Sequence, residues 1–309
     1  MNFFKPKFWD KNKVSFFSIL FFPITLIVKL FNFLKHYIIN TKKSSIPVIC
    51  VGNIYLGGTG KTPLTIEIFS ILKKLNMNPA FIRKKYTSFV DEVKLQEKYG
   101  PIYQNKKRMS AIEEASNHKI DVAILDDGFQ DFSIYKDFSI ICFNEKQWVG
   151  NGLTIPSGPL RESLSSLKRA DCVFINGNRN ISIEKKIYDQ KKEIKIFYIK
   201  YKVQNAQEFI NKNVTVFAGI GNPINFFDLV KDSNINIIKR FEFPDHYKYP
   251  KNVLENLIKK SKENNTFLLT TEKDYVRIDE NYKKDIKYLK IEVVIEKKNE
   301  FIEELKKII

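Results

Sequence analysis

The chain has 309 residues, of which 43% are hydrophobic and 28% charged, a balance typical of a globular protein with a real core and not of a disordered one. Basic residues outnumber acidic ones by 52 to 35, and the net charge of +17 favours anionic partners such as nucleotides, phosphorylated substrates or phospholipid surfaces. Cys50, Cys142 and Cys172 each lie in an apolar run without metal-ligand spacing, which predicts buried thiols and excludes a disulfide framework.

The N-terminal segment, residues 1–40, begins with basic and aromatic residues and then runs from Ser15 to Val28 without a charge. This stretch is too short for an untilted membrane span, which needs about twenty residues. No Ala-x-Ala-like site follows it, as a signal peptide would require. Lysines flank the stretch, and the pattern predicts a helix lying in a membrane interface. The alternative is a hydrophobic helix in the core of the domain.

A pattern typical of a phosphate-binding loop follows. Val48 to Val51 is a short apolar strand, after which glycines precede a helix that opens with Lys61. Loop N–H groups and the helix N-terminus would hold phosphates, Lys61 would add a charge, and the Thr62 hydroxyl would face Mg²⁺. Tyr55 stands where the strict pattern has glycine, and the alternative is a glycine-rich turn before a capped helix. The residues expected to bind the nucleotide are Gly57, Gly58, Thr59, Gly60, Lys61 and Thr62.

Strands and helices alternate from Ser45 onward. Apolar runs at 80–82, 122–125, 138–143 and 172–175 predict strands buried on both faces, and the α/β class is that of a P-loop NTPase-like doubly wound parallel sheet. Asp126 and Asp127 follow the run 122–125 directly, at the sheet edge where the phosphate loop emerges. Carboxylates there suit Mg²⁺ or its waters, although a simple Asp-Asp-Gly turn is the alternative.

Composition shifts to Lys, Asn, Gln and Glu over residues 178–213, which we interpret as a linker. A second, smaller α/β domain then begins at 214–219, with a strand expected at 288–295 and a closing helix after Asn299. The predicted organisation is an N-terminal membrane-associated helical segment (1–40), a P-loop domain (41–200) and a smaller α/β domain (201–309).

Several blocks of sequence carry a family resemblance. They are Val51–Pro63, Leu125–Gln130, Pro156–Glu162, Phe217–Pro223, Phe243–Tyr247 and Leu269–Asp274. In this order they resemble the tetraacyldisaccharide 4′-kinases, the lipid A kinases of Gram-negative bacteria. The family also lacks the glycine that Tyr55 replaces. The chain departs from the family at residues 83–87, where the glycines of an Arg-Gly-Tyr-Gly-like turn are missing.

The resemblance implies an enzyme that uses ATP and Mg²⁺ to phosphorylate the 4′-hydroxyl of an acylated glucosamine disaccharide 1-phosphate, giving lipid IVA. It implies a peripheral or monotopic location on the cytoplasmic face of the bacterial inner membrane. It assigns Arg161 to neutralising phosphate charge and Glu162 to the metal, with Thr62, Asp126 and Asp127. By itself, Arg161 is equally consistent with an ion pair at a helix start.

A sugar hydroxyl is a poor nucleophile, so a carboxylate that takes its proton is useful. With the resemblance, we predict that Asp91 is this base and that His246, from the second domain, assists it. We place Asp91 in a loop after the second strand. Without the resemblance, a solvated loop acid and a turn histidine are the favoured interpretation.

Two other functions compete with the lipid kinase. A soluble P-loop NTPase that binds nucleic acid would use the basic surface, but no aromatic-and-glycine RNA signature or basic recognition helix occurs, and we expect no nucleic-acid partner. A membrane-bound ATP-binding regulator would use the carboxylates for nucleotide sensing. Lys273 and Asp274 are adjacent, whereas a guanine-specificity motif needs one residue between them, so a GTPase is not expected.

Overall fold

The computed structural model describes residues 6–10, 13–85 and 90–309. Its contacts divide the chain into two compact units. The large unit holds the described residues 6–10, 13–85, 99–200 and 295–309, and the small unit holds 90–98 and 201–294. The three domains predicted from the sequence (1–40, 41–200 and 201–309) are segments of sequence rather than contact units and stay a prediction.

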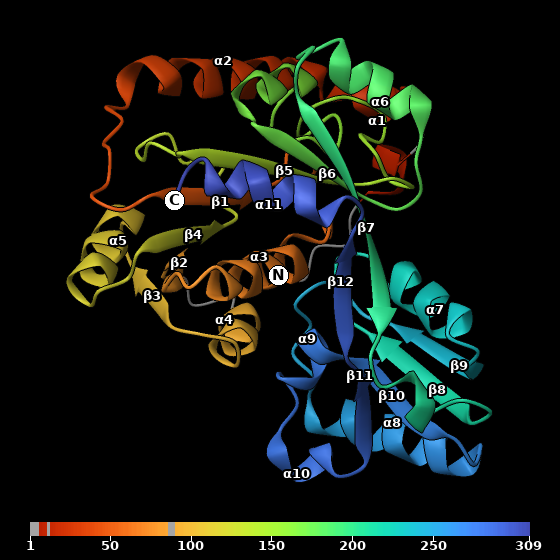
Figure 1. The fold of residues 1–309 in the computed structure, drawn as a ribbon. Coiled ribbons are helices and arrows are strands. Elements are labelled where there is room, and N and C mark those ends of the chain that lie inside the picture. Colours follow the sequence, from red (N-terminus) through yellow and green to blue (C-terminus); the bar gives the residue numbers. More distant parts are fainter. Residues whose placement is uncertain (1–5, 11–12, 86–89) are drawn as a thin grey trace. The chain divides into compact units, whose positions relative to one another are not determined.

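The large unit is built on a sheet with the strand order β12-β7-β6-β5-β1-β4-β2-β3 (Figure 1). From β7 to β3 every neighbouring pair is parallel, which confirms the predicted doubly wound parallel sheet. The strands are β1 (Val48–Gly52), β2 (Pro79–Lys84), β3 (Ile102–Asn105), β4 (Val122–Asp126), β5 (Phe138–Asn144), β6 (Cys172–Asn176), β7 (Lys195–Val203) and β12 (Ile291–Ile295). β7 and β12 carry the chain between the two units.

Helices cover both faces of this sheet, because alternate residues of a buried strand point to opposite faces (Figure 1). One set of strand residues packs against α5 and α6 in a single core cluster. The other set meets α3, where Phe69 stacks on Phe81 at 4.7 Å, and α11, where the Phe301 ring lies 4.8 Å from Phe174. The helices of this unit are η1 (Lys7–Asp10), α1 (Phe16–Leu20), α2 (Phe22–Ile38), α3 (Lys61–Lys74), α5 (Arg108–Asn117), η2 (Leu164–Arg169), α6 (Ile181–Tyr188) and α11 (Lys298–Lys306).

The three cysteines lie in the strands of this sheet. All are free and fully buried, which confirms the predicted buried thiols. Burial raises the pKa of Cys50 to about 11, so its thiol stays protonated and packs as a small apolar group.

The small unit has a four-stranded sheet in the order β11-β10-β8-β9, with every neighbouring pair parallel. Its strands are β8 (Asn213–Ala218), β9 (Asn236–Glu242), β10 (Phe267–Thr271) and β11 (Ile286–Leu289). Its helices are α4 (Val90–Glu97), η3 (Ala206–Glu208), α7 (Pro223–Asp232), α8 (Lys251–Glu263), α9 (Glu272–Tyr275) and α10 (Glu280–Lys283). α4 comes from the sequence between β2 and β3, and it packs against α9.

Two expectations about this part of the chain are wrong. Residues 178–213 are not a linker, because they contain α6, β7 and η3. Lysines at both ends of β7 gave the stretch a loop-like composition, although its central residues 197–199 are buried. The single strand expected at 288–295 is two strands, β11 and β12, interrupted at Lys290.

The charge-free N-terminal stretch forms α1 and the start of α2, with a break at Phe21. Within residues 16–35, only positions 18, 21, 25, 28 and 32 are not exposed to solvent. This spacing of three and four is one face of a helix, and that face is the one turned to the protein. The alternative of a helix in the core of the domain is therefore wrong. No helix among the described residues is long and apolar enough to span a membrane.

The face turned to the protein carries a polar residue every seven positions: Ser18, Thr25 and Asn32. Asn151 donates to the Ser18 hydroxyl at 3.1 Å, and the buried Thr25 donates to Ser157 at 2.8 Å. The Asn32 amide donates to the backbone oxygen of residue 161 at 3.4 Å. We call these contacts the polar seam. The exposed apolar side chains of α1 and α2 are Phe16, Phe17, Ile19, Leu20, Phe22, Ile24, Leu26, Ile27, Leu30, Phe31, Phe33, Leu34, Tyr37 and Ile38.

Candidate active site

The glycine loop joins β1 to α3 at the carboxyl edge of the sheet. Gly57 and Gly60 have φ values of 138° and 91°, in the region that side-chain-bearing residues rarely adopt, and Gly60 caps the N-terminus of α3. The buried Asn53 donates to the Gly57 oxygen at 3.2 Å and to the Thr59 hydroxyl at 3.1 Å. The side-chain amide of Asn53 thus holds the loop in its conformation, and the loop ends at the N-terminus of α3.

Tyr55 explains why a glycine is dispensable at its position. Its side chain is fully buried, and its hydroxyl donates to Asp10 at 2.6 Å. The backbone on either side of Tyr55 pairs with the segment before η2: Leu56 donates to Pro159 at 2.8 Å, and Arg161 donates to Ile54 at 2.7 Å. This pairing fixes Arg161 beside the glycine loop.

Asp126 ends β4 with only 2% of its surface exposed. Its Oδ2 accepts a hydrogen bond from the Thr62 hydroxyl at 3.2 Å and lies 2.8 Å from Nη1 of the buried Arg83, at the end of β2. The structure therefore brings together Thr62 and Asp126, two of the predicted metal ligands, from the first turn of α3 and the end of β4.

Asp127 forms ion pairs with two cations next to the glycine loop. One of its oxygens lies 2.7 Å from Nη1 of Arg161 and 3.7 Å from Nζ of Lys61. Its backbone has a positive φ of 62°, and Arg108 holds that strained turn by donating to the Asp127 oxygen at 2.9 Å. Lys61 and Arg161 thus share one carboxylate next to the glycine loop, and both are side chains that pair strongly with phosphate oxygens.

The donor set fits Mg²⁺ in part. Mg²⁺ prefers oxygen ligands and usually keeps several waters, binding through one or two carboxylates together with phosphate oxygens. Thr62 and Asp126 offer such oxygens side by side. Glu162 is instead ion-paired with Arg169, whose guanidinium lies over the Phe129 ring at 4.3 Å. In the described ranges, no group of three or more His, Cys, Asp or Glu side chains is arranged to hold a metal by itself.

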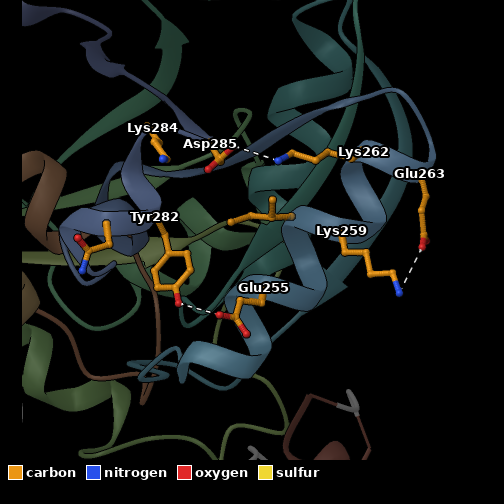
Figure 2. Close-up of a pocket in the computed structure, with 9 residues that line it drawn as sticks. Glu255, Lys259, Lys262, Glu263, Tyr282, Lys284 and Asp285 are labelled. Atoms are coloured by element: carbon orange, nitrogen blue, oxygen red, sulfur yellow. Dashed lines mark hydrogen bonds and ion pairs between the residues drawn. The ribbon is translucent and has the colours of Figure 1, made fainter.

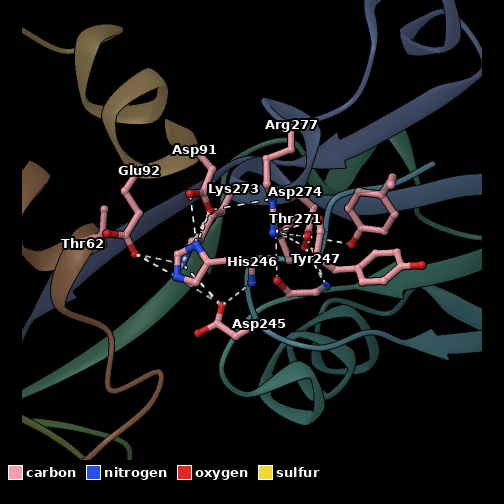
Figure 3. A network of polar contacts seen from close by, with 12 residues as sticks. Thr62, Asp91, Glu92, Asp245, His246, Tyr247, Thr271, Lys273, Asp274 and Arg277 are labelled. Carbon is pink, nitrogen blue, oxygen red and sulfur yellow. Dashed lines mark hydrogen bonds and ion pairs between the residues drawn. The ribbon is translucent and has the colours of Figure 1, made fainter. Parts of the chain in front are cut away.

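Asp91 and His246 lie together in the small unit (Figure 3). Nδ1 of His246 is 2.9 and 3.0 Å from the two carboxylate oxygens of Asp91, which is 3% exposed. Asp91 was expected in a loop, but it lies in the first turn of α4, where an acid is favourable near the helix N-terminus. Burial alone would raise the pKa of Asp91, yet the hydrogen bond from His246 and the charges of Lys273 and Arg277 hold that pKa below its usual value.

A second buried carboxylate positions His246. Asp274 is fully buried and accepts hydrogen bonds from the Gly219 N–H at 3.1 Å and the Tyr249 hydroxyl at 2.8 Å, and it pairs with Arg277. The Gly219 oxygen in turn accepts from the His246 N–H at 3.1 Å and from Arg277 at 2.8 Å. His246 is held with a positive φ of 57°, a conformation that persists only where its surroundings enforce it.

Comparison with known proteins gives one consistent result. The family model described as tetraacyldisaccharide-1-P 4′-kinase (LpxK) matches residues 15–309. A tetraacyldisaccharide 4′-kinase of Pelagibacter ubique is 45% identical over 93% of this chain and 92% of its own length. The chain belongs to the tetraacyldisaccharide 4′-kinase family. A Rickettsia canadensis family member is 35% identical over 88% of this chain and 87% of its own. The crystal structure of LpxK from Aquifex aeolicus in complex with ATP has a TM-score of 0.70 and 20% identity over 94% of this chain and 99% of that one, and it shares the fold.

In this family member, a surface hollow of about 510 Å³ between α8 and α10 is separate from the predicted site residues (Figure 2). Some of its polar groups pair with one another: Lys262 lies 3.5 Å from Asp285, and the Tyr282 hydroxyl donates to Glu255 at 3.1 Å. The lining holds three lysines and three carboxylates, so the hollow has no net charge that would attract a phosphate.

Sequence reasoning missed several residues that shape this kinase-family site. Asn53 and Gln130 lie inside the blocks of the resemblance but were given no role, although Gln130 donates to the Asn53 oxygen at 3.0 Å and accepts from Arg161 at 3.4 Å. Arg108 carries no pattern of its own. Arg83 matches the arginine of the family's Arg-Gly-Tyr-Gly-like turn and stands at the end of an apolar strand, like Asp126, but neither signal gives it a role.

We predict that Asp91 stabilises this family member in a pH-dependent way. Because its pKa is lower in the folded than in the unfolded state, where it is about 3.9, its contribution is full above that value and is lost as the pH falls through the folded pKa. Asp91→Asn should lower the free energy of unfolding by about 1.5–3 kcal/mol at pH 7. Calorimetric unfolding at a series of pH values should show this difference shrinking below about pH 4.

Asp232→Asn is the matched control, because Asp232 is an exposed carboxylate on α7 of the same unit. Its effect should be small at every pH. A deficit in Asp91→Asn that stays constant down to acid pH would contradict the assignment of the lowered pKa.

Proposed function

We propose that this chain transfers the γ-phosphate of ATP to the 4′-hydroxyl of tetraacyldisaccharide 1-phosphate, giving lipid IVA. The observation that carries the proposal is the cradle of glycine loop, Lys61, Arg161 and Asp127 in a chain whose relatives are tetraacyldisaccharide 4′-kinases. The Aquifex LpxK, which shares the fold, is in complex with ATP, and this supports ATP as the phosphate donor.

On the nucleotide side, the roles follow from charge and position. Backbone N–H groups of residues 57–62 and the N-terminus of α3 bind the phosphates, and Lys61 and Arg161 balance the charge that spreads over the transferred group. Thr62, with Asp126 or Asp127, would hold Mg²⁺, and Glu162 stays a prediction as a further ligand. A bound Mg²⁺ supplies charge neutralisation and orients the phosphates. Positioning and electrostatics provide most of the catalysis in phosphoryl transfer.

On the acceptor side, we assign the base to Asp91. Its carboxylate is ionised at neutral pH, because His246 and the nearby cations lower its pKa. It accepts the proton of the 4′-hydroxyl as that oxygen attacks phosphorus, and His246 holds the carboxylate in position by donating from Nδ1.

We also propose that the chain binds the cytoplasmic face of the bacterial inner membrane through the outer surface of α1 and α2. Soluble monomers rarely expose contiguous apolar patches of this kind, and a helix that turns apolar residues outward with basic residues at its edges suits the lipid interface. The acceptor's acyl chains reside in the same interface. A membrane is thus the occupant that explains both the surface and the substrate.

The central test is transfer of labelled phosphate from ATP to tetraacyldisaccharide 1-phosphate in detergent micelles. Lys61→Ala should lower the rate by about two to three orders of magnitude, because it removes charge stabilisation from the transferred phosphoryl group. Lys74→Ala is the matched control, since Lys74 is exposed at the far end of the same helix. Wild-type activity in Lys61→Ala would remove the phosphate-loop assignment.

A double-mutant cycle tests the base. Asp91→Ala and His246→Ala should each lower kcat by about 10²–10⁴-fold with little change in the KM for ATP. Their combination should cost far less than the sum of the two, because residues acting as one unit are not additive. His118→Ala, which removes a histidine bonded to Tyr103, serves as the control. Additive losses, or a main effect on ATP binding, would contradict the pairing.

Single substitutions can test membrane binding without disturbing the fold. Deleting the segment would also remove Trp9 and Thr25, which are buried against residues 150–157. Phe31→Ser changes a side chain that is 63% exposed, and it should reduce recovery with vesicles and raise KM for the lipid more than for ATP. Ile181→Ser, at 76% exposure on α6, is the matched control. Equal effects of the two substitutions would refute the proposed surface.

A further inference from the structure

The side chain of Lys273 ends in the middle of the polar network around His246 (Figure 3). Its Nζ donates to Glu92 at 2.9 Å and lies 3.3 Å from Nε2 of His246. It is also 3.6 Å from Asp245 and 3.9 Å from Asp91. Lys273 lies in the block 269–274, and the reaction described above uses it only as one of the charges that lower the pKa of Asp91.

Lys273 is an ammonium in this setting. Burial acts to lower its pKa, but the carboxylates of Glu92, Asp245 and Asp91 raise it well above its ordinary value. An ammonium has three N–H donors and no lone pair, so an imidazole nitrogen beside it must be the acceptor. If Nε2 of His246 accepts from this ammonium at 3.3 Å, it carries no proton, and the proton of the ring then lies on Nδ1, facing Asp91.

The other charged groups around the ring act against this arrangement. Glu92 and Asp245 each have an oxygen 3.7 Å from Nε2, and by themselves they would favour a proton there. Lys273 is nearer to Nε2 than either and lies within 3.6 Å of both carboxylates, so it offsets their charge. Arg277, with Nε 3.7 Å from Asp91, adds a second positive charge beside that carboxylate.

We propose that Lys273 is a positioning residue that fixes the tautomer of His246, with the proton on Nδ1, so that the ring donates to Asp91 and leaves Nε2 as an acceptor. In the other tautomer, the lone pair of Nδ1 would face the Asp91 carboxylate, and two acceptors would oppose each other at 2.9 Å. The consequence for catalysis rests on the proposed function, whereas the tautomer itself does not.

The tautomer can be observed directly, because the chain has only three histidines. Protein labelled with ¹⁵N-histidine gives long-range ¹H–¹⁵N correlations in which the protonated and bare ring nitrogens differ strongly, and His246→Asn assigns the residue. At neutral pH the wild-type His246 should show a protonated Nδ1 and a bare Nε2. A protonated Nε2, in either the other tautomer or the imidazolium, overturns the proposal without any variant of Lys273.

Variants of Lys273 then test the cause. Lys273→Met keeps the length of the side chain and removes the donor, so the His246 spectrum should shift toward a protonated Nε2, while Lys273→Arg should retain the wild-type tautomer. In the transfer assay, Lys273→Met should lower kcat by about tenfold or more with the KM for ATP unchanged, and Lys273→Arg should recover most of it.

Lys98→Met is the matched control. Lys98 also links the end of α4 to the α9 turn, through Glu272 at 3.0 Å, but it is 40% exposed and forms its contact outside the His246 network. It should leave both the spectrum and kcat unchanged. An unshifted His246 spectrum in Lys273→Met overturns the proposal, even if activity falls. The expected tautomer in a wild-type protein that transfers no phosphate leaves the proposal standing and removes only the proposed function.

Discussion

Asp126 has almost no exposed surface, and a carboxylate buried to that degree is stable only among donors and cations. Arg83 from β2 and the Thr62 hydroxyl from α3 meet it at the end of β4. Because β1 lies directly beside β4, the same carboxylate sets where the glycine loop begins and where α3 starts. The glycine loop and the start of α3 are therefore tied to one buried charge that β2 and α3 satisfy together.

The small unit also contains a fully buried carboxylate that is stabilised by donors and a cation, namely Asp274. That carboxylate binds the turn after β8 through Gly219, and together with Arg277 it holds the backbone that presents His246. In both units, a buried acid that pairs with an arginine lies near a second acid: Asp126 pairs with Arg83 and precedes Asp127, and Arg277 contacts both Asp274 and Asp91. Breaking such a buried pair is costly because the remaining charge has no water to replace its partner. The two acids to which we assign roles in the reaction are therefore positioned by buried ion pairs.

Local physics explains which parts could be predicted. The strands at 48–51 and 122–125 are apolar runs, and the glycine loop needs no tertiary information to be recognised. The Arg83–Asp126 ion pair depends on β2 lying beside β4. The order of strands in a sheet is a tertiary property, and the local sequence around either residue does not indicate it. The acids that begin α4 are an ordinary helix signal, so the placement of Asp91 in a helix was within reach of the sequence.

Other features lie outside any local pattern. Asp91 and His246 are 155 residues apart in sequence, and their contact was predicted only through the family resemblance. The composition of residues 178–213 favours a linker, because the lysines of β7 outweigh its short buried centre. In the sequence, Lys273 stands out only as part of the family block 269–274 and as a poor match to a guanine-specificity motif. Its neighbours Glu92 and Asp245 come from two distant segments, so its role depends on the tertiary fold.

The polar seam under α1 and α2 has a thermodynamic consequence of its own. Most amphipathic helices attach to their protein by burying apolar surface. The hydrophobic effect that drives this attachment is lost when lipid replaces water around the helix. Here Ser18, Thr25 and Asn32 attach the helices through hydrogen bonds, whose strength grows as the surrounding dielectric constant falls. Moving this pair of helices from water into a lipid interface would leave its outer side chains better solvated and its attachment to residues 151–161 firmer.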